Sequence, residues 1–544
     1  MRKKLLLLPL LALTAAGAQA QGLLGGHITG NVQLDAQISR QDSTIGAPDV
    51  PEWLLMNARA DVLYTNGGFS AGLRFEVYQN PLLGFNANYK GQGLANYFIS
   101  YRNDKLSVTA GHFYEQFGNG MILRTYEDRN LGLDNALFGF GVNYRPIDGV
   151  TIKGVIGKQR YCWTMGDGIV RGVDAEINFN SLIKAWNGSP FRLSVGGGFV
   201  SKYEEDETIM SDQPGYKLNL PLNVGSGSAR INLGYKGFNL DVEYARKGQD
   251  PNVMNGYIYR PGQALMLNAS YSQRGFSANI QAKRVDNMGF KSVRTQTGDM
   301  LYINYIPAIN KQHTYAFMTM FPYATQATGE MGLQGDVIWK IVKGTDLHLN
   351  ASFITGIDTN RIGGKGTEGY SSDFCKFGSL YYGDASVELA QKLSSQVKLT
   401  ATYCYQVFNP TVDGHSGDLH HNNIVVGDLT WKINKKNVLR FEAEWLVSDS
   451  RCDDINVDDK RNGNWIMGLV EYNFTSKWFV SLSDQYCYKN GKGNYYNISV
   501  GYTSGATRVQ LGYGKQREGL ICIGGVCRTV PASNGLTLTL TTSF

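Results

Sequence analysis

A glycine- and aromatic-rich stretch near residue 120 concentrates charged side chains that could act on ions or polar solutes. The stretch is "GHFYEQFGNGMILRTYEDRNLGLDNALFGFG", residues 111–141, and its charged candidates are Glu115, Arg124, Glu127, Arg129 and Asp134. Charged groups that line a pore set its width and its preference among ions. Two interpretations stay open. The 115–135 loop folds inward as a constriction with its charges paired to the wall, or it forms a salt-bridged cap on the outside.

Other groups of residues lack the spacing that metal binding or catalysis requires. His415, His420 and His421 lie together in "DGHSGDLHHNN", where a solvated polar loop is a simpler interpretation than a metal site. His112 and His348 are each isolated within a predicted strand. We therefore predict no catalytic residues, no metal ligands and no cofactor.

The seven cysteines favour disulfides in an exported chain. Cys522 and Cys527 flank Gly524-Gly525 in "GLICIGGVCRTV", and the glycines permit a tight reversal, so we predict a disulfide between them. Cys452 and Cys487, on neighbouring loops, are a second candidate pair. Cys404 is expected to point inward from its strand. The odd number leaves at least one thiol without an intramolecular partner.

Strands must position these residues, because polar and apolar side chains alternate along most of the chain. In "HITGNVQLDAQIS", residues 27–39, every second residue from Ile28 is uncharged and most are aliphatic, while the residues between them are polar. "VKLTATYCYQV", residues 397–407, repeats the pattern. A period of two predicts extended strands with one apolar and one polar face.

Connection lengths indicate how these strands are arranged. Tight turns such as Lys236-Gly237 and Lys343-Gly344 alternate with longer polar loops such as 79–93 and 203–228. Short turns at one rim and long loops at the other are typical of bacterial outer-membrane barrels. The sequence predicts a single large antiparallel transmembrane β-barrel of about 26 strands, with 24 as the alternative if a pair is lost within 298–341.

The first residues of the chain are predicted to form an export signal. Arg2, Lys3 and Lys4 precede a short apolar run, and Ala18-Gln19-Ala20 forms a cleavage signature, so residues 1–20 are predicted to be a signal peptide and 21–544 the barrel. The formal net charge of +6 falls to +3 once those three basic residues leave. This near balance gives no reason to expect a nucleic-acid partner.

In such a barrel the apolar faces contact lipid and the alternating charged residues line the lumen. The residues predicted to be lumenal include Arg59, Asp61, Arg74, Glu76, Lys153, Asp174, Asp241, Glu243, Asp428, Arg440, Glu442 and Glu444. Both signs occur on neighbouring strands, which predicts ion-pair ladders rather than strong ion selectivity. The strands begin soon after the predicted cleavage site, so we expect no plug domain.

Three stretches suggest a family. "GHFYEQFGNGMILRTYEDRNLGLDNALFGFGVNYRP", "INKQHTYAFMTMFPYATQATGEMGLQGDVIWKI" and "GLICIGGVCRTVPASNGLTLTLTTSF" resemble an uncharacterised family of Bacteroidota outer-membrane proteins. The resemblance runs over nearly the whole mature chain. It implies an outer-membrane location and a barrel, and it transfers no catalytic or binding residue.

The sequence thus favours a channel or transporter for solutes, its lumen lined by mixed charges and narrowed by the 115–135 loop. The alternative is a scaffold or accessory component of envelope assembly or protein secretion, which would bind a periplasmic or lipoprotein partner. A surface enzyme is the weakest interpretation, and we predict that the chain is no enzyme. Outer-membrane lipids are the expected surroundings.

Overall fold

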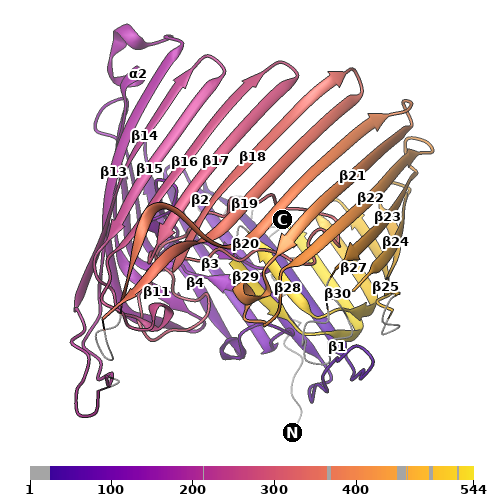
Figure 1. Ribbon diagram of the computed structural model, residues 1–544, viewed down its shortest axis with the longest axis horizontal. Coiled ribbons are helices and arrows are strands. Elements are labelled where there is room, and N and C mark those ends of the chain that lie inside the picture. Colours follow the sequence, from indigo (N-terminus) through magenta and orange to yellow (C-terminus); the bar gives the residue numbers. More distant parts are fainter. Residues whose placement is uncertain are drawn as a thin grey trace.

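The chain forms a closed barrel whose strands are steeply tilted (Figure 1). The structure is a computed structural model, and it describes residues 25–211, 213–363, 369–449, 461, 463–488, 494–523 and 526–544. The predicted signal peptide, residues 1–20, and Cys452 lie outside the described residues. A single 24-stranded antiparallel sheet closes because β1 pairs with β30, with Asn31 opposite Ser543 and Ser39 opposite Gly535.

The barrel strands follow the chain in order around the wall. They are β1 (His27–Ser39), β2 (Leu55–Asn66), β3 (Phe69–Asn80), β4 (Gly91–Arg102), β5 (Leu106–Phe113), β10 (Leu137–Tyr144), β11 (Val150–Tyr161), β12 (Thr164–Asn178), β13 (Phe191–Tyr203), β14 (Asn223–Tyr235), β15 (Phe238–Lys247), β16 (Gly262–Gln273), β17 (Phe276–Asp286), β18 (Gly329–Val342), β19 (Thr345–Ile362), β20 (Gly369–Lys392), β21 (Val397–Phe408), β22 (His420–Lys432), β23 (Val438–Ser448), β24 (Trp465–Phe474), β25 (Trp478–Cys487), β26 (Asn497–Ser504), β27 (Thr507–Gln516) and β30 (Ser533–Ser543).

Shorter elements lie in the connections. They are η2 (Ala87–Tyr89), β6 (Gln116–Phe117), β7 (Leu123–Arg124), β8 (Glu127–Asp128), β9 (Leu133–Asp134), α2 (Phe179–Leu182), η3 (Lys184–Trp186), η4 (Val253–Asn255), η5 (Pro410–Asp413), β28 (Gly519–Ile523) and β29 (Val526–Val530). None of the described helices is long and apolar enough to cross a membrane.

The period of two seen in the sequence separates the two faces of the wall. Along β21, Thr402 and Cys404 are buried on the lumenal side, whereas Tyr403 and Tyr405 are exposed on the outside. Large apolar side chains are likewise exposed on other strands, Leu73 and Ile99 at 55% each. A continuous apolar exterior is stable only against lipid. The predicted transmembrane barrel is therefore confirmed.

Connection lengths also follow the predicted alternation. The rim that is uppermost in Figure 1 carries the tight turns, and α2 stands on it. The opposite rim carries the long loops. Among the connections that the structure describes in full, two depart from the rule: β11 and β12 are joined by a tight turn at the long-loop rim, and the β12–β13 connection at the tight-turn rim is longer because it contains α2 and η3.

The count of about 26 strands is wrong, and the alternative of 24 is the observed number. The missing pair falls where the sequence was ambiguous, since residues 287–328 form no barrel strand between β17 and β18. They pack instead against the inner wall, as described below. Among the described residues, the lumen is filled by connections of the barrel itself and not by a separate plug domain.

Candidate functional site

Two connections fold inward and occupy the lumen. The first lumenal segment, residues 114–136, joins β5 to β10 and contains the small pairs β6–β7 and β8–β9. Gly118 and Gly120 turn it at φ angles of 51° and 93°, which other residues rarely adopt. A β-carbon at Gly118 would lie 2.5 Å from the carboxylate of Glu243 on β15, so glycine also permits close contact with the wall.

Buried ion pairs attach the first lumenal segment to β2, β3 and β11. Arg74 Nη2 lies 3.0 Å from Glu127 Oε2, and Arg59 also pairs with Glu127. Arg160 Nη1 lies 2.5 Å from Asp134 Oδ2. The Arg160, Glu127 and Asp134 side chains are 2%, 17% and 6% exposed. Charges this deeply buried are stable only when they are paired and hydrogen-bonded, so the network fixes where the segment lies.

The other predicted residues of this segment have further contacts, and Arg129 Nε also lies 3.7 Å from Glu127 Oε1. Lys153 Nζ lies 2.8 Å from Glu115 Oε1, and Arg129 donates a 2.9 Å hydrogen bond to Gln33 Oε1. The Arg124 guanidinium lies 4.1 Å from the centre of the Tyr305 ring. The structure thus brings Glu127, Asp134 and Arg129 together in one network and places Glu115 and Arg124 around it. Their role as a constriction stays a prediction.

The second lumenal segment, residues 287–328, was not anticipated from the sequence. Phe317 and Phe321 are fully buried in a cluster with Phe408 and Trp465. The ring centres of Phe321 and Phe408 are 5.6 Å apart, and those of Phe317 and Trp465 are 6.3 Å apart. The available signal was "YAFMTMFPYA", which is rich in aromatic and methionine residues but lacks the polar alternation of a barrel strand.

Polar contacts supplement this apolar packing. The backbone N–H groups of Ala316 and Phe317 donate to the Glu444 carboxylate on β23 at 2.9 and 2.8 Å. Lys311 Nζ lies 3.3 Å from His348 Nδ1 on β19. The second lumenal segment therefore contacts inward-facing residues from β19 to β24.

The two segments also bind each other through backbone groups. The Tyr305 N–H donates to the Gly120 carbonyl at 3.0 Å, and the Arg124 N–H donates to the Ile303 carbonyl at 2.9 Å. The side-chain amide of Asn304 donates to the Met121 carbonyl at 3.1 Å. These bonds join the segments into one layer that reaches from the β2–β3 wall to the β20–β24 wall.

A cavity of about 550 Å³ remains beside this layer. Its lining includes Gln33 and Asp35 on β1, Arg59 on β2, Arg129 of the first segment and Arg528 of the β28–β29 hairpin. Burial and the neighbouring Arg59 lower the pKa of Arg129, and burial lowers the pKa of Arg528. Both signs of charge line this cavity, together with apolar side chains such as Leu82, Phe85 and Ile521.

The β28–β29 hairpin forms one side of this cavity and contains the predicted disulfide. Cys522 and Cys527 are bonded to each other and lie opposite one another in the hairpin, so the predicted pairing is confirmed. The Arg528 guanidinium lies 4.1 Å from the centre of the Phe85 ring in the β3–β4 loop. The hairpin is thereby held against a neighbouring loop.

The lumenal wall carries ion pairs between nearby strands, as the alternation predicted, and the Arg230–Asp174 pair crosses β13 to join β14 to β12. Arg230 Nη1 lies 2.7 Å from Asp174 Oδ1, and Arg440 Nη2 lies 2.8 Å from Asp428 Oδ2. Arg74 Nε lies 2.6 Å from Asp61 Oδ1. Opposite charges are thus interspersed around the lumen.

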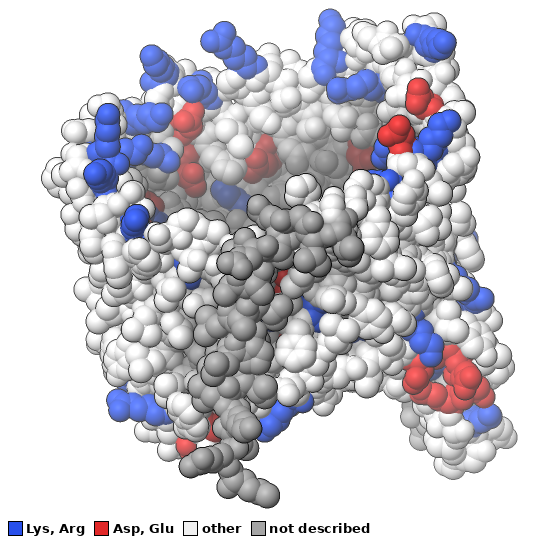
Figure 2. All heavy atoms as spheres, turned by 180° about the vertical axis from the view of Figure 1, so that it is seen from behind, with Lys and Arg blue, Asp and Glu red and all other residues white. Residues whose placement is uncertain are grey.

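The tight-turn rim is rich in basic residues. Figure 2 shows Lys and Arg side chains gathered along its upper edge, where the molecule is hollowed. The basic residues of these turns are Lys105, Arg145, Lys184, Lys236, Arg274, Lys343, Lys435, Lys436 and Lys477, all exposed, against the acidic residues Asp104 and Asp148. This entrance to the lumen is therefore electropositive.

One short sequence motif warrants comment because it occurs in some hydrolases. Gly68–Gly72 reads G-x-S-x-G, but Ser70 lies within β3 and its Oγ is 2.7 Å from the Oγ of Ser100. A nucleophile elbow instead places its serine at a sharp strand-to-helix turn. Ser70 does not have that geometry.

The comparisons with solved structures give only distant likenesses. A mutant of the Rh. blastica porin has 13% identity and a TM-score of 0.27, covering 65% of this chain and 100% of that one. The P pilus usher PapC translocation pore has 10% identity and a TM-score of 0.38, covering 95% and 99%. A mutant ferric enterobactin receptor PfeA from Pseudomonas aeruginosa has 10% identity and a TM-score of 0.43, covering 95% and 80%. At these values they carry no argument about function.

No curated protein matches the chain. A family model does, and it extends over residues 1–544. The resemblance noted in the sequence is thus confirmed as membership of an uncharacterised family, while the Bacteroidota origin stays a prediction. The chain belongs to the family of unknown function DUF6029.

Proposed function

We propose that this protein is an outer-membrane channel for polar solutes whose lumen is narrowed by its two lumenal segments. The observation that supports this most strongly is the attachment of the first segment to a charged, water-compatible lumenal wall through Arg59, Arg74 and Arg160. Solutes would pass beside the segment, through the cavity bounded by β1, β2 and the β28–β29 hairpin. The predicted cleaved signal peptide and the apolar exterior support the location.

The mixed charges of the lumen define what such a channel would admit. Because acidic and basic side chains alternate around the wall, neither sign of ion is strongly excluded. The electropositive tight-turn rim would raise the local concentration of anions at that entrance. We therefore expect weak anion preference at low salt, which screening reduces at high salt.

Single-channel conductance in planar bilayers tests the proposal. The proteins compared are the intact barrel, a variant lacking residues 116–135, and a variant in which 290–326 is replaced by a short Gly-Ser linker. The intact barrel should show a small steady conductance, and each deletion should increase it. Absence of conductance from all three proteins would contradict the channel, provided that heat-dependent electrophoretic mobility shows that they are folded.

A second candidate is a scaffold of envelope assembly or secretion, and the basic tight-turn rim is the observation that favours it. Exposed lysines and arginines on turns suit an acidic periplasmic partner. The same bilayer experiment separates the two candidates. A barrel that stays silent but binds an acidic partner in a salt-sensitive manner would favour the scaffold.

A further inference from the structure

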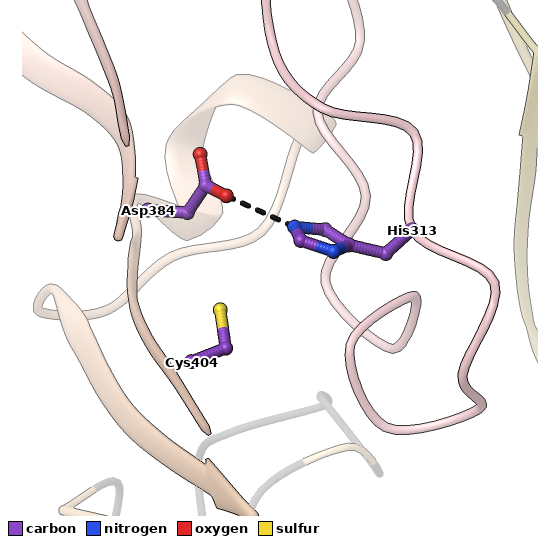
Figure 3. A group of neighbouring side chains, drawn as sticks. All are labelled: His313, Asp384 and Cys404. Carbon is purple, nitrogen blue, oxygen red and sulfur yellow. Dashed lines mark hydrogen bonds and ion pairs between the residues drawn. The ribbon is translucent and has the colours of Figure 1, made fainter. Parts of the chain in front are cut away.

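Three side chains from three parts of the chain converge where the second lumenal segment contacts the wall. His313 belongs to the segment, Asp384 to β20 and Cys404 to β21, and Figure 3 shows their polar ends turned toward one another. His313 Nε2 lies 2.9 Å from Asp384 Oδ2. One nitrogen, one oxygen and one sulfur ligand atom all lie within 4.8 Å of each other.

Ordinary packing leaves part of this cluster unexplained. The His313 side chain is 4% exposed and that of Asp384 is 0% exposed, so the pair is shielded from water. Asp384 Oδ1 is buried and has no hydrogen-bond partner among the described residues, although its other oxygen is bonded to His313. A buried carboxylate oxygen without a partner is costly, and a bound cation would remove that cost.

The ligand chemistry narrows the choice of cation. Imidazole, carboxylate and thiolate together suit Zn²⁺, whereas Mg²⁺ and Ca²⁺ take oxygen ligands. Zinc sites with three protein ligands keep water as the fourth ligand. Binding would require the ligand atoms to approach to about 2.0–2.3 Å from the metal, so the His313–Asp384 hydrogen bond would open. The Cys404 thiol would release its proton to solvent as the Zn–S bond forms.

We propose that His313, Asp384 and Cys404 bind a Zn²⁺ ion that fastens the second lumenal segment to the wall between β20 and β21. Two of the ligands are fixed on adjacent strands and the third lies on the segment. The ion would thus hold the segment in place only while His313 stays at the wall. This gives the channel of the preceding section a means of control, but metal binding itself does not depend on that function.

Cobalt titration of the metal-free, folded barrel in detergent tests the site. Co²⁺ bound through a thiolate gives a near-ultraviolet charge-transfer absorption, which should saturate at one equivalent and disappear when Zn²⁺ is added. Cys404→Ser should abolish this absorption. Cys375→Ser removes an exposed thiol from β20 and should leave it intact. His313→Ala should weaken Co²⁺ binding by more than about tenfold.

A second measurement reports whether the second lumenal segment stays attached to the wall. Lys311 lies close to His313 in the chain, and Zn²⁺ should slow trypsin cleavage after Lys311 in the intact barrel and in Cys375→Ser but not in Cys404→Ser. Absence of the cobalt–thiolate absorption from the folded intact barrel, or its persistence in Cys404→Ser, would overturn the proposal. A barrel that binds Co²⁺ through Cys404 but never conducts ions would support the metal site and contradict the proposed channel.

Discussion

The two lumenal segments are attached to the same wall by different interactions. The first, residues 114–136, relies on buried ion pairs from Glu127 and Asp134 to arginines of β2, β3 and β11. The second, residues 287–328, relies on an apolar cluster centred on Phe317 and Phe321. Both are buried, and the first segment also packs Phe117, Ile122 and Leu123 into an apolar cluster with β11–β17. The attachments therefore differ in the charged network that the first segment adds and in the aromatic cluster of the second.

The two kinds of attachment contribute differently to where a segment lies and to how stably it is docked. An arginine–carboxylate pair accepts a narrow range of geometries, so the charged network holds the first segment in one place. Its net contribution to stability is small because desolvation offsets much of the attraction. Apolar packing has no such offset and scales with the buried area. We therefore expect the apolar clusters of the two segments, rather than the ion pairs, to supply most of the free energy that keeps the lumenal layer docked.

The largest effect should come from removing the two rings of the second segment. Phe317→Ala combined with Phe321→Ala leaves cavities in the cluster, and each ring contributes about 3–5 kcal/mol to docking. The segment should detach from the wall, which trypsin cleavage after Lys311 would report as a faster rate. The mean open conductance should rise with it.

A lipid-facing ring provides the matched control for this variant. Phe441 on β23 is 40% exposed on the outer face and does not contact the segment cluster. Phe441→Ala should leave cleavage after Lys311 unchanged. Equal acceleration in both variants would show that the whole barrel had loosened and that the cluster has no special role.

A smaller effect is expected when the charged attachment is broken. Arg160→Met leaves the buried Glu76 and Asp134 carboxylates with the longer pairs to Arg74, at 3.7 and 3.4 Å, and loss of one partner of a buried pair costs about 3–5 kcal/mol. The first segment should become open to trypsin after Arg124 and Arg129, while cleavage after Lys311 changes less. Because the two segments share backbone hydrogen bonds, we expect some effect on the second segment as well.

Two further variants test whether the effect of Arg160→Met comes from the burial of its ion pairs. Adding Glu76→Gln to Arg160→Met removes one of the two carboxylate charges that Arg160 had paired with and should recover part of the protection. Lys90→Ala breaks the exposed Lys90–Glu52 pair, whose side chains are 60% and 38% exposed, and should change stability by less than about 1 kcal/mol. Equal effects of Arg160→Met and Lys90→Ala would contradict a structural role for burial.

The wall was predictable from sequence because the membrane imposes a simple rule on each strand. Tyr403 and Tyr405 face outward and Cys404 inward, as the alternation along β21 predicted. The tight turns were equally predictable from sequence, because glycines such as Gly237 and Gly344 mark them. Both signals are local, and lipid on one side leaves little freedom to override them.

The lumenal layer could not be predicted to the same extent. The charges of the first segment were visible, but their partners Arg74 and Arg160 lie on other strands and become neighbours only when the barrel closes. The second segment is rich in aromatic residues, a composition that also suits strands. His313 and Cys404 are far apart in the chain and in no spacing that signals a metal site, so only the fold brings them together.

The pH dependence of one buried lysine tests how stably the second segment is docked, and we expect this effect to be the smallest. Lys291 Nζ donates to the Gln296 carbonyl at 2.9 Å and lies 4.5 Å from the centre of the Tyr302 ring. Burial lowers the pKa of Lys291 to about 8, against the opposing effect of Asp299. A released segment would have the ordinary lysine pKa of about 10.4.

Between pH 8 and pH 10 the released segment therefore binds a proton that the docked segment does not, so docking should strengthen as the pH rises. Below pH 8 both forms are protonated and this dependence disappears. Hydrogen–deuterium exchange of peptides covering 289–303, corrected for the intrinsic pH dependence of exchange, should show less opening at pH 10 than at pH 8. Lys291→Met should remove that difference. If the difference persists in Lys291→Met, another group controls the opening, and the lysine is only a packing element of the second segment.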